Sequence, residues 1–241
     1  MKIQYSFKRY EKKFLLTPEQ FDVILPALKS RLSEEEYGLH TICSIYYDTD
    51  NFDLIRNSVE RPVYKEKFRI RSYGVPNEDS VIFAEIKKKS EGIVYKRRVD
   101  GNPSEILSFV SEGYSLDRDP QIQREIQWFL HVNQPVPKVF IGYERIAMLG
   151  IEDKNLRVTF DRNIRWRRDR LDLRMGDDGE PILPDDIIIM EVKTPAAIPL
   201  WLVKMLSENE IYPASFSKYG TCYQQYILPN AFQKGSFSYV K

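Results

Sequence analysis

Basic side chains alternate with other residues along one short stretch of the sequence, YKEKFRIRSYG at residues 64–74. The basic positions are Lys65, Lys67, Arg69 and Arg71. In a β-strand, residues two apart share one face, so these four side chains would lie together. Arginine binds phosphate through two parallel hydrogen bonds, and lysine adds a compact positive charge. A strand of this kind could therefore hold an anion that carries several negative charges.

The same alternation recurs elsewhere in the chain. Polar positions two residues apart occur at Glu11 and Lys13, at Glu85, Lys87 and Lys89, at Lys96 and Arg98, at Arg157, Thr159 and Asp161, and at Glu191 and Lys193. A single charged strand usually has a solvated face whose charges pair in water. Repetition on neighbouring strands fits that interpretation less well, because like charges side by side repel. The alternative is a barrel with its charged faces inward, and about eight strands enclose room for one small ligand.

Glutamates stand among these basic positions. Carboxylate oxygens are ligands that Mg²⁺ and Mn²⁺ prefer, and such ions bridge phosphate oxygens. The pattern therefore suits a divalent metal beside a phosphate-containing anion.

The composition limits the class of protein. The chain has 241 residues, of which 42% are hydrophobic, which predicts one folded domain over residues 1–241. The formal net charge is +1, so a basic site must be a local concentration, and no nucleic acid partner is expected. Cys43 and Cys222 have no metal or redox spacing, which is typical of reduced thiols in a cytosolic protein. The first residues have no signal-peptide pattern, and no apolar run is as long as a membrane span, so we expect a cytoplasmic location without membrane insertion.

Strand and helix patterns place these residues. Strands are predicted at residues 5–16, 41–48, 64–73, 81–89, 93–99, 138–149, 156–166 and 187–194. Helices are predicted after the capping sequence TPEQ at Thr17, and at residues 49–58, 103–112, 120–132, 199–209 and 216–228. Pro26 should kink or shorten the first helix. Short turns between strands imply antiparallel neighbours. The predicted fold is mainly β (α+β), a closed antiparallel tunnel barrel of about eight strands with helices packed outside.

Nine short motifs of the sequence resemble those of a known family. The motifs RYEKKFLL, SIYYDTDNF, KFRIRSYG, FAEIKKK, VYKRRV, GYER, LRVTFDRNI, MEVK and FSKYG occur in the order seen in the VTC domain, from about Phe7 to Tyr226. That family is part of the triphosphate tunnel metalloenzymes, or CYTH superfamily. The resemblance implies an antiparallel barrel whose basic tunnel binds triphosphate and a divalent metal. The similar domain of the eukaryotic VTC complex is a polyphosphate polymerase that takes phosphate from ATP.

The resemblance also implies roles for individual residues. The residues that it implies for phosphate binding are Lys13, Arg69, Arg71, Lys87, Lys96, Arg145, Arg157 and Lys218. The alternation along the strands adds Arg98 and Lys193 to the residues expected to bind substrate. The residues expected to act in catalysis are Arg69, Arg71, Lys87, Arg157 and Glu191. Glu191, in MEVK, is the expected ligand of Mn²⁺ or Mg²⁺, with Glu85 and Glu11 as further candidates. Lys218 is expected where the last helix begins, and a helix N-terminus attracts anions.

One motif departs from the superfamily. Hydrolytic and cyclase members carry E-x-E-x-K on the first strand, whereas this chain has Arg9-Tyr10-Glu11-Lys12-Lys13. The arginine at the first position favours the VTC branch, and it leaves Glu11 open as a metal ligand or a partner for neighbouring cations. No SPX-like helical domain or membrane segment accompanies the motifs, so regulation and export would need a separate membrane partner protein.

The favoured function is metal-dependent phosphoryl transfer from the γ-phosphate of ATP to a growing polyphosphate chain. A triphosphatase is the second hypothesis, and a non-catalytic polyphosphate- or nucleotide-binding module is the third. His40 and His131 have no metal-ligand or catalytic-triad pattern around them in the sequence, and no functional role is expected for them. The basic run RWRRDR at residues 165–170 is expected at the tunnel rim or in a solvated loop rather than on nucleic acid.

Overall fold

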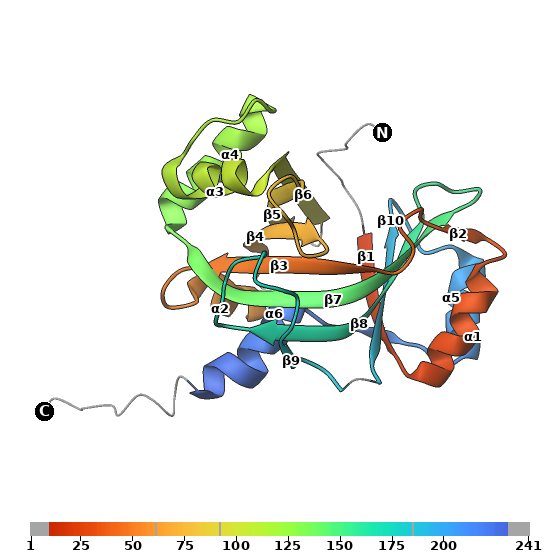
Figure 1. Ribbon diagram of the computed structural model, residues 1–241. Coiled ribbons are helices and arrows are strands. Elements are labelled where there is room, and N and C mark those ends of the chain that lie inside the picture. The colour runs from red at the N-terminus through yellow and green to blue at the C-terminus, as the bar shows by residue number, and fades with distance from the viewer. Residues whose placement is uncertain (1–9, 61, 92, 185, 231–241) are drawn as a thin grey trace, which may run out of the picture.

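The structure is a computed structural model that describes residues 10–60, 62–91, 93–184 and 186–230 (Figure 1). Its helices are α1 (Pro18–Leu28), α2 (Asp53–Val59), α3 (Pro103–Glu112), α4 (Pro120–Asn133), α5 (Leu200–Glu208) and α6 (Lys218–Cys222), followed by the π-helical turn η1 (Tyr223–Ile227). Its strands are β1 (Tyr10–Leu16), β2 (Leu32–Glu34), β3 (His40–Asp48), β4 (Tyr64–Tyr73), β5 (Ile82–Ser90), β6 (Ile93–Gly101), β7 (Val136–Gly150), β8 (Arg157–Arg167), β9 (Glu180–Pro181), β10 (Ile188–Thr194) and β11 (Pro213–Ala214).

The predicted mainly-β fold is confirmed. The strands form one antiparallel sheet in the order β11-β1-β10-β8-β7-β3-β4-β5-β6, with β2 on β7 and β9 on β8. Within the described residues, eight of these strands have seven or more residues. The three very short strands were not predicted. The first predicted strand begins at residue 5, and its part before Tyr10, with Phe7 and Arg9, lies outside the described residues.

The prediction of a closed barrel is not confirmed. In the described part of the chain, the backbone pairing ends at β6 on one side and at β11 on the other. β6 comes close to β1 without a ladder between them. The reason lies at the free edge of β1, where β11 pairs with Lys13 and Phe14. Closing the barrel would require β6 to use an edge that β11 partly occupies.

The apolar faces of the strands are covered by helices at two places. Phe68 and Ile70 of β4 are buried in a core that α3 and α4 cover. At the other end of the sheet, Phe160 of β8 and Met190 of β10 lie in a core with α1 and α5. Figure 1 shows these two helix pairs on opposite flanks of the sheet. The strands of both regions therefore turn their other, charged face away from these cores.

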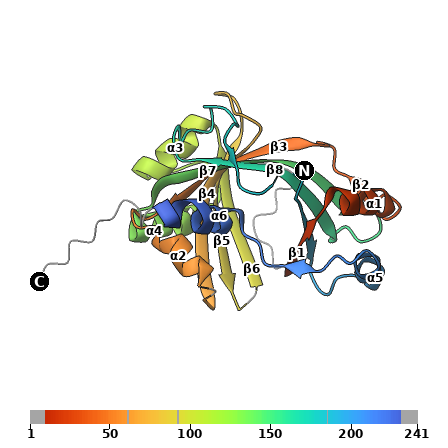
Figure 2. The same cartoon turned by 90° about the horizontal axis from the view of Figure 1, so that it is seen from below.

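A third core involves the opposite face of the sheet. Ile42 of β3, Ile141 and Tyr143 of β7 and Ile164 of β8 pack with Tyr219 of α6 and with neighbouring residues of η1. Seen from below, α6 lies across the strands beside α2 (Figure 2). The C-terminal helix therefore forms part of the wall next to the charged side chains.

Local sequence signals explain where the helices begin. Thr17 accepts a hydrogen bond from the Gln20 backbone and completes a capping box. Asn102 caps α3 in the same way. Pro26 lies inside α1, which ends at Leu28, and the predicted kink or shortening stays a prediction. No helix in the described ranges is long and apolar enough to cross a membrane.

Candidate anion-binding site

Strand register brings the predicted charged positions together. Lys67 on β4 lies opposite Lys87 on β5, which lies opposite Lys96 on β6. The next row in the same register contains Arg69, Glu85 and Arg98. We use the name charged face for the side chains of Glu11, Lys13, Lys67, Arg69, Arg71, Glu85, Lys87, Lys96, Arg98, Arg145, Arg157, Asp161, Glu191, Lys193 and Lys218. This set includes the thirteen residues that the sequence predicted for the site, and their roles in binding and catalysis stay predictions.

Glu85 is the centre of one cluster of charges. Its Oε2 accepts hydrogen bonds from Nε and Nη2 of Arg69 at 2.9 and 2.8 Å. Lys96 contacts the other carboxylate oxygen, and Arg71 Nε lies 3.9 Å from Oε2. The Glu85 side chain is 1% exposed. Burial alone would raise its pKa, but Lys96 and Arg69 hold that pKa well below the usual range.

Asp161 is the centre of a second cluster. Its two oxygens accept Nε and Nη2 of Arg145 at 2.6 and 2.8 Å, which is a bidentate pair. Lys218, the first residue of α6, also contacts Asp161. Burial opposes the charged form, yet these two cations lower the pKa of Asp161. The carboxylate thus holds an arginine of β7 and a lysine of the C-terminal helix in one place.

Glu191 and Glu11 lie among lysines. Glu191 pairs with Lys193 at 3.0 Å, and Glu11 pairs with Lys87 at 2.7 Å. The second pair joins β1 to β5 across the open side of the sheet. Although burial raises the pKa of Glu191, Lys193 and Lys13 hold it well below the usual range. The Glu191 carboxylate is therefore ionised.

The positive charge on the charged face exceeds the negative charge. Burial, together with repulsion from Lys13 and other cations, lowers the pKa of Lys67 to about 7. Burial also lowers the pKa of Lys96 to about 7 and that of Lys193 to about 8, in spite of their contacts with Glu85 and Glu191. Burial is the main cause of these shifts, and the charged face also holds eleven basic side chains against four carboxylates. The site as it stands is short of negative charge.

Two predicted residues lie at the margins of this network. Arg157 Nη2 donates to Glu35 Oε2 at 2.9 Å, so its charge is partly engaged by a residue that follows β2. The Arg98 guanidinium lies over the ring of Phe83 at 4.5 Å. Both keep the strand face that the sequence predicted.

The predicted orientation of β4 is confirmed in part. Phe68 and Ile70 lie in the apolar core, and the side chains of Arg69 and Arg71 are 19% and 7% exposed. The two arginines are therefore not on an open outer surface. An enclosed cavity at this place stays a prediction.

Several residues of the site were not among those predicted. Arg69 Nη1 donates to the Tyr46 hydroxyl at 3.0 Å, and Arg71 Nη2 donates to the Tyr143 hydroxyl at 2.9 Å. Asp161 could have been found, because it shares the strand face of Arg157. The tyrosines lie inside quoted motifs, SIYYDTDNF and GYER, but nothing in their spacing indicates an arginine partner.

The three candidate metal ligands differ in their fit to a divalent ion. Three cations surround Glu85 and already neutralise its charge, so Glu85 fits a divalent ion poorly. Glu191 and Glu11 stand diagonally on the neighbouring strands β10 and β1, because in the strand register Glu11 lies opposite Lys193 and Lys13 lies opposite Glu191. Within the described ranges no group of three or more His, Cys, Asp or Glu side chains could hold a metal alone. Mg²⁺ commonly binds through one or two carboxylates plus phosphate oxygens, and Glu191 with Glu11 fits that arrangement.

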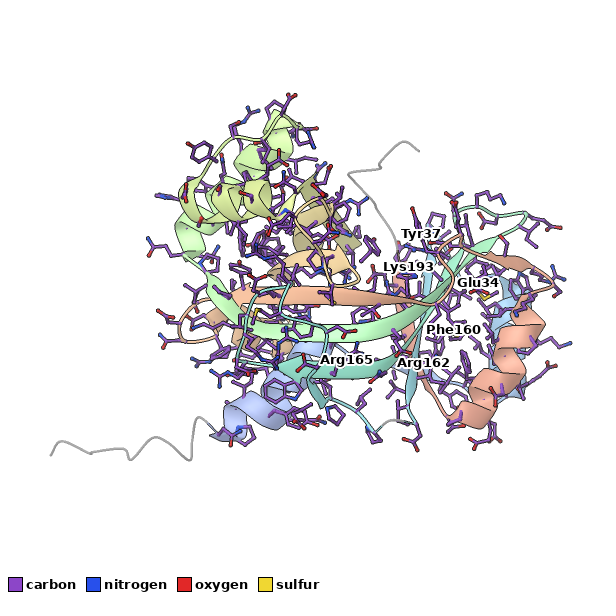
Figure 3. The ribbon with its side chains drawn as sticks, viewed as in Figure 1. Glu34, Tyr37, Phe160, Arg162, Arg165 and Lys193 are labelled. Atoms are coloured by element: carbon purple, nitrogen blue, oxygen red, sulfur yellow. The ribbon has the colours of Figure 1, made fainter. Side chains whose placement is uncertain are left out.

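The basic run at residues 165–170 has two parts: residues 168–170 lie in an exposed loop, as predicted, whereas Arg165 and Arg167 lie on β8 and have a structural role. Arg165 and Arg167 are buried and bind backbone carbonyls of the loop that follows β8. Arg165 also pairs with the Asp177 side chain at 2.6 Å. Figure 3 shows Arg165 and Arg162 on β8, with Lys193 toward the end of the sheet where Glu34 and Tyr37 lie.

Comparisons with known proteins come from sequence and from structure. The VTC domain family profile matches residues 8–227. No curated protein matches the sequence. A candidate adenylate cyclase from Bacillus halodurans is 12% identical, with a TM-score of 0.58 over 93% of this chain and 100% of that chain. A Hippeastrum protein, a candidate adenylyl cyclase described as having a dominant triphosphatase activity, is 15% identical, with a TM-score of 0.53 over 92% of this chain and 98% of that chain. At these identities the two structures are similar to this chain in fold.

Proposed function

Because this chain belongs to the VTC domain family, we propose that it binds a triphosphate and transfers a phosphoryl group, with the γ-phosphate of ATP as donor and the end of a polyphosphate chain as acceptor. The donor and acceptor would both lie along the charged face. The proposal for the acceptor rests on the family and on Arg9, which replaces the first glutamate of the hydrolytic E-x-E-x-K motif.

The observation that carries the proposal is the excess of positive charge over carboxylates on the partly buried charged face. Burial lowers the pKa of Lys67 and Lys96 to about 7, which means that the fold destabilises the charged form of both amines. A bound polyanion would supply the missing negative charge and restore the lysines to their charged form. A solvated face would not produce this shift, because water would stabilise the ammonium groups.

The arginines would orient the substrate. Arg69 and Arg71 are held by the two tyrosine hydroxyls and by Glu85, so their guanidinium planes are fixed before a ligand arrives. Lys218 and Arg145 are fixed in the same way by Asp161. Phosphoryl transfer depends mainly on such positioning and on offsetting the charge of the transferring group. No side chain has to act as a covalent nucleophile.

Glu191 would hold the divalent metal, Mn²⁺ or Mg²⁺, with Glu11 as a second carboxylate. The ion would supply positive charge to phosphate oxygens. To bind the metal, Glu11 would have to give up its ion pair with Lys87. The Lys87 ammonium group could then pair with a phosphate of the substrate instead. We do not assign Glu85 to the metal, because its three cationic neighbours already neutralise it.

A triphosphatase is the second candidate. It is supported by the fold similarity to the Hippeastrum protein, for which a dominant triphosphatase activity is described. A binding module without turnover would need the same cations. A separate membrane partner protein stays a prediction from the family resemblance.

Incubation with ATP and Mn²⁺ or Mg²⁺ tests these candidates against one another. A polymerase yields acid-insoluble phosphate chains and ADP, whereas a triphosphatase yields free phosphate. Binding of ATP or tripolyphosphate without either product would identify a binding module. Absence of any binding at low ionic strength would refute the proposed site.

A further inference from the structure

The segment from Phe216 to Tyr219 contacts several strands of the site at once. Lys13 Nζ of β1 donates to the Phe216 carbonyl at 2.8 Å, and Lys67 Nζ of β4 donates to Ser217 Oγ at 2.9 Å. Lys218 reaches Asp161 of β8. Three successive residues therefore meet cations or a carboxylate of the charged face, and the position of this segment determines where those charges lie.

The segment cannot hold this position by helix formation alone. α6 and η1 are contiguous, and the helical segment runs from residue 218 to residue 230. An isolated helix of about this length is only marginally stable in water, so its position depends on tertiary contacts. A fixed anchor is needed close to Lys218.

Tyr219 is that anchor. Its hydroxyl donates to Asp48 Oδ2 at 2.9 Å, in the interior of the protein. Asp48 is fully buried at the end of β3, and its carboxylate also accepts the backbone N–H groups of Thr49, Leu54 and Ile55. The first turn of α2 thus fixes Asp48, and Asp48 fixes the residue next to Lys218.

Tyr219 also reaches the arginine side of the site. Its ring stacks on the ring of Tyr46, with centroids 4.9 Å apart and planes inclined by 25°. The Tyr46 hydroxyl accepts a hydrogen bond from Arg69. One side chain therefore supports Lys218 along the backbone and Arg69 through a stacked ring.

We propose that Tyr219, held by Asp48, is a positioning residue for anion binding, which sets Lys218 through its hydroxyl and Arg69 through its stacked ring. This inference rests on the proposed function, since it assumes that the charged face binds a polyphosphate. Tyr219 itself does not touch the phosphate oxygens, so its effect must pass through the two cations.

A matched pair of variants tests the hydroxyl. Tyr219→Phe removes the hydrogen bond to Asp48 and keeps the ring stack. Asp48 still accepts its backbone partners, so no buried carboxylate is left unpaired. Tyr226→Phe is the control, because Tyr226 lies on η1 and its hydroxyl donates to the Ile182 carbonyl at 3.1 Å. Both changes remove one hydrogen bond between the C-terminal helix and the body of the protein.

Calorimetric titration with tripolyphosphate provides the readout, with thermal unfolding measured in parallel. We expect Tyr219→Phe to weaken binding by about tenfold, as is typical when a partner that orients a contacting group is lost. Tyr226→Phe should leave the affinity unchanged at a similar loss of melting temperature. Tyr219→Leu, which also removes the stack on Tyr46, should weaken binding further than Tyr219→Phe.

A double-mutant cycle with Lys218→Ala identifies the route. If Tyr219 acts through Lys218, then Tyr219→Phe should add little to the loss caused by Lys218→Ala. Additive losses of affinity in the cycle, or equal losses of affinity for Tyr219→Phe and Tyr226→Phe, would overturn the inference. The proposed function would still stand in that case, provided that the wild type binds tripolyphosphate. A wild type that binds no tripolyphosphate at low salt would overturn both.

Discussion

Replacing Glu85 by glutamine tests whether Glu85 is a charge partner of the neighbouring cations or a metal ligand. The substitution keeps the size of the side chain and removes its negative charge. Glu85 is buried and is shared by Arg69, Lys96 and Arg71. We therefore expect Glu85→Gln to leave one buried cation, Arg71, and two partly buried ones, Arg69 and Lys96, without their common counter-charge.

The magnitude follows from what the carboxylate neutralises. Removing one partner of a buried charge pair costs about 3–5 kcal/mol of folding free energy. In a domain of this size, about 1 kcal/mol lowers the melting temperature by roughly 2–4 °C. We expect the melting temperature of Glu85→Gln to fall by about 6–20 °C. Part of that loss should return with tripolyphosphate, because a bound anion can neutralise the same cations.

Thermal unfolding with and without tripolyphosphate measures both effects. Glu78→Gln is the control, since Glu78 pairs with Arg174 at 2.9 Å on the surface, where its side chain is 74% exposed. Surface pairs contribute little, so its melting temperature should stay that of the wild type. A Glu85→Gln variant with wild-type stability and impaired Mn²⁺ binding would refute the reasoning and restore Glu85 as a metal ligand.

Three further predictions concern the metal, the arginines and the lysines. Glu191→Gln should abolish turnover and leave tripolyphosphate binding measurable by calorimetry, because cations supply most of the affinity; full activity would remove Glu191 from the mechanism. Arg71→Ala should weaken tripolyphosphate binding by about 1.5–3 kcal/mol, the size of a lost charged hydrogen bond, and more so at low salt, whereas an unchanged affinity would exclude Arg71 from the site. The pKa values of Lys67 and Lys96 are about 7 in the fold, below the usual lysine value, so the unfolded chain binds more protons and stability should rise with pH from about 7 to 10. A bound anion should raise these pKa values, so titrations near pH 7.5 in buffers of different ionisation enthalpy should show proton uptake; this uptake should decrease in Lys67→Met and Lys96→Met, and an equal uptake in both variants and wild type would contradict the assignment.

The alternation of residues along the strands predicted the charged face well. Phe68 and Ile70 must be buried for the sheet to have a core, and this requirement turns Arg69 and Arg71 to the other side. The predicted range of β4 and that of α3 agree with the structure for the same reason, since each has a clear periodicity and end signals. The local pattern of residues was enough to predict a strand or helix wherever one of its faces had to be apolar.

Pairing between distant residues could not be predicted in this way. Glu85 was a further candidate for the metal, and the sequence did not indicate that three cations from two other strands surround it; its metal role stays a prediction. Closure of the barrel failed as a prediction because Pro213–Ala214, which has no strand propensity, pairs with β1. Tyr219 and Asp48 are far apart in the sequence and share no motif. Each of these features depends on which segments meet in three dimensions.

The open side of the sheet affects how a long polyanion could reach the charged face. On this open side, where β6 comes close to β1 without pairing, the ion pair of Lys87 on β5 with Glu11 on β1 joins the two edge regions of the sheet, and its side chains are 38% and 16% exposed. Breaking such a pair costs about 1 kcal/mol or less, whereas separating a hydrogen-bonded strand would break many bonds together. A linear chain could therefore be laid in sideways along its length, without a free end being threaded through the protein. Release of a long product would then depend on salt, because the same ions that loosen this pair also compete for the chain.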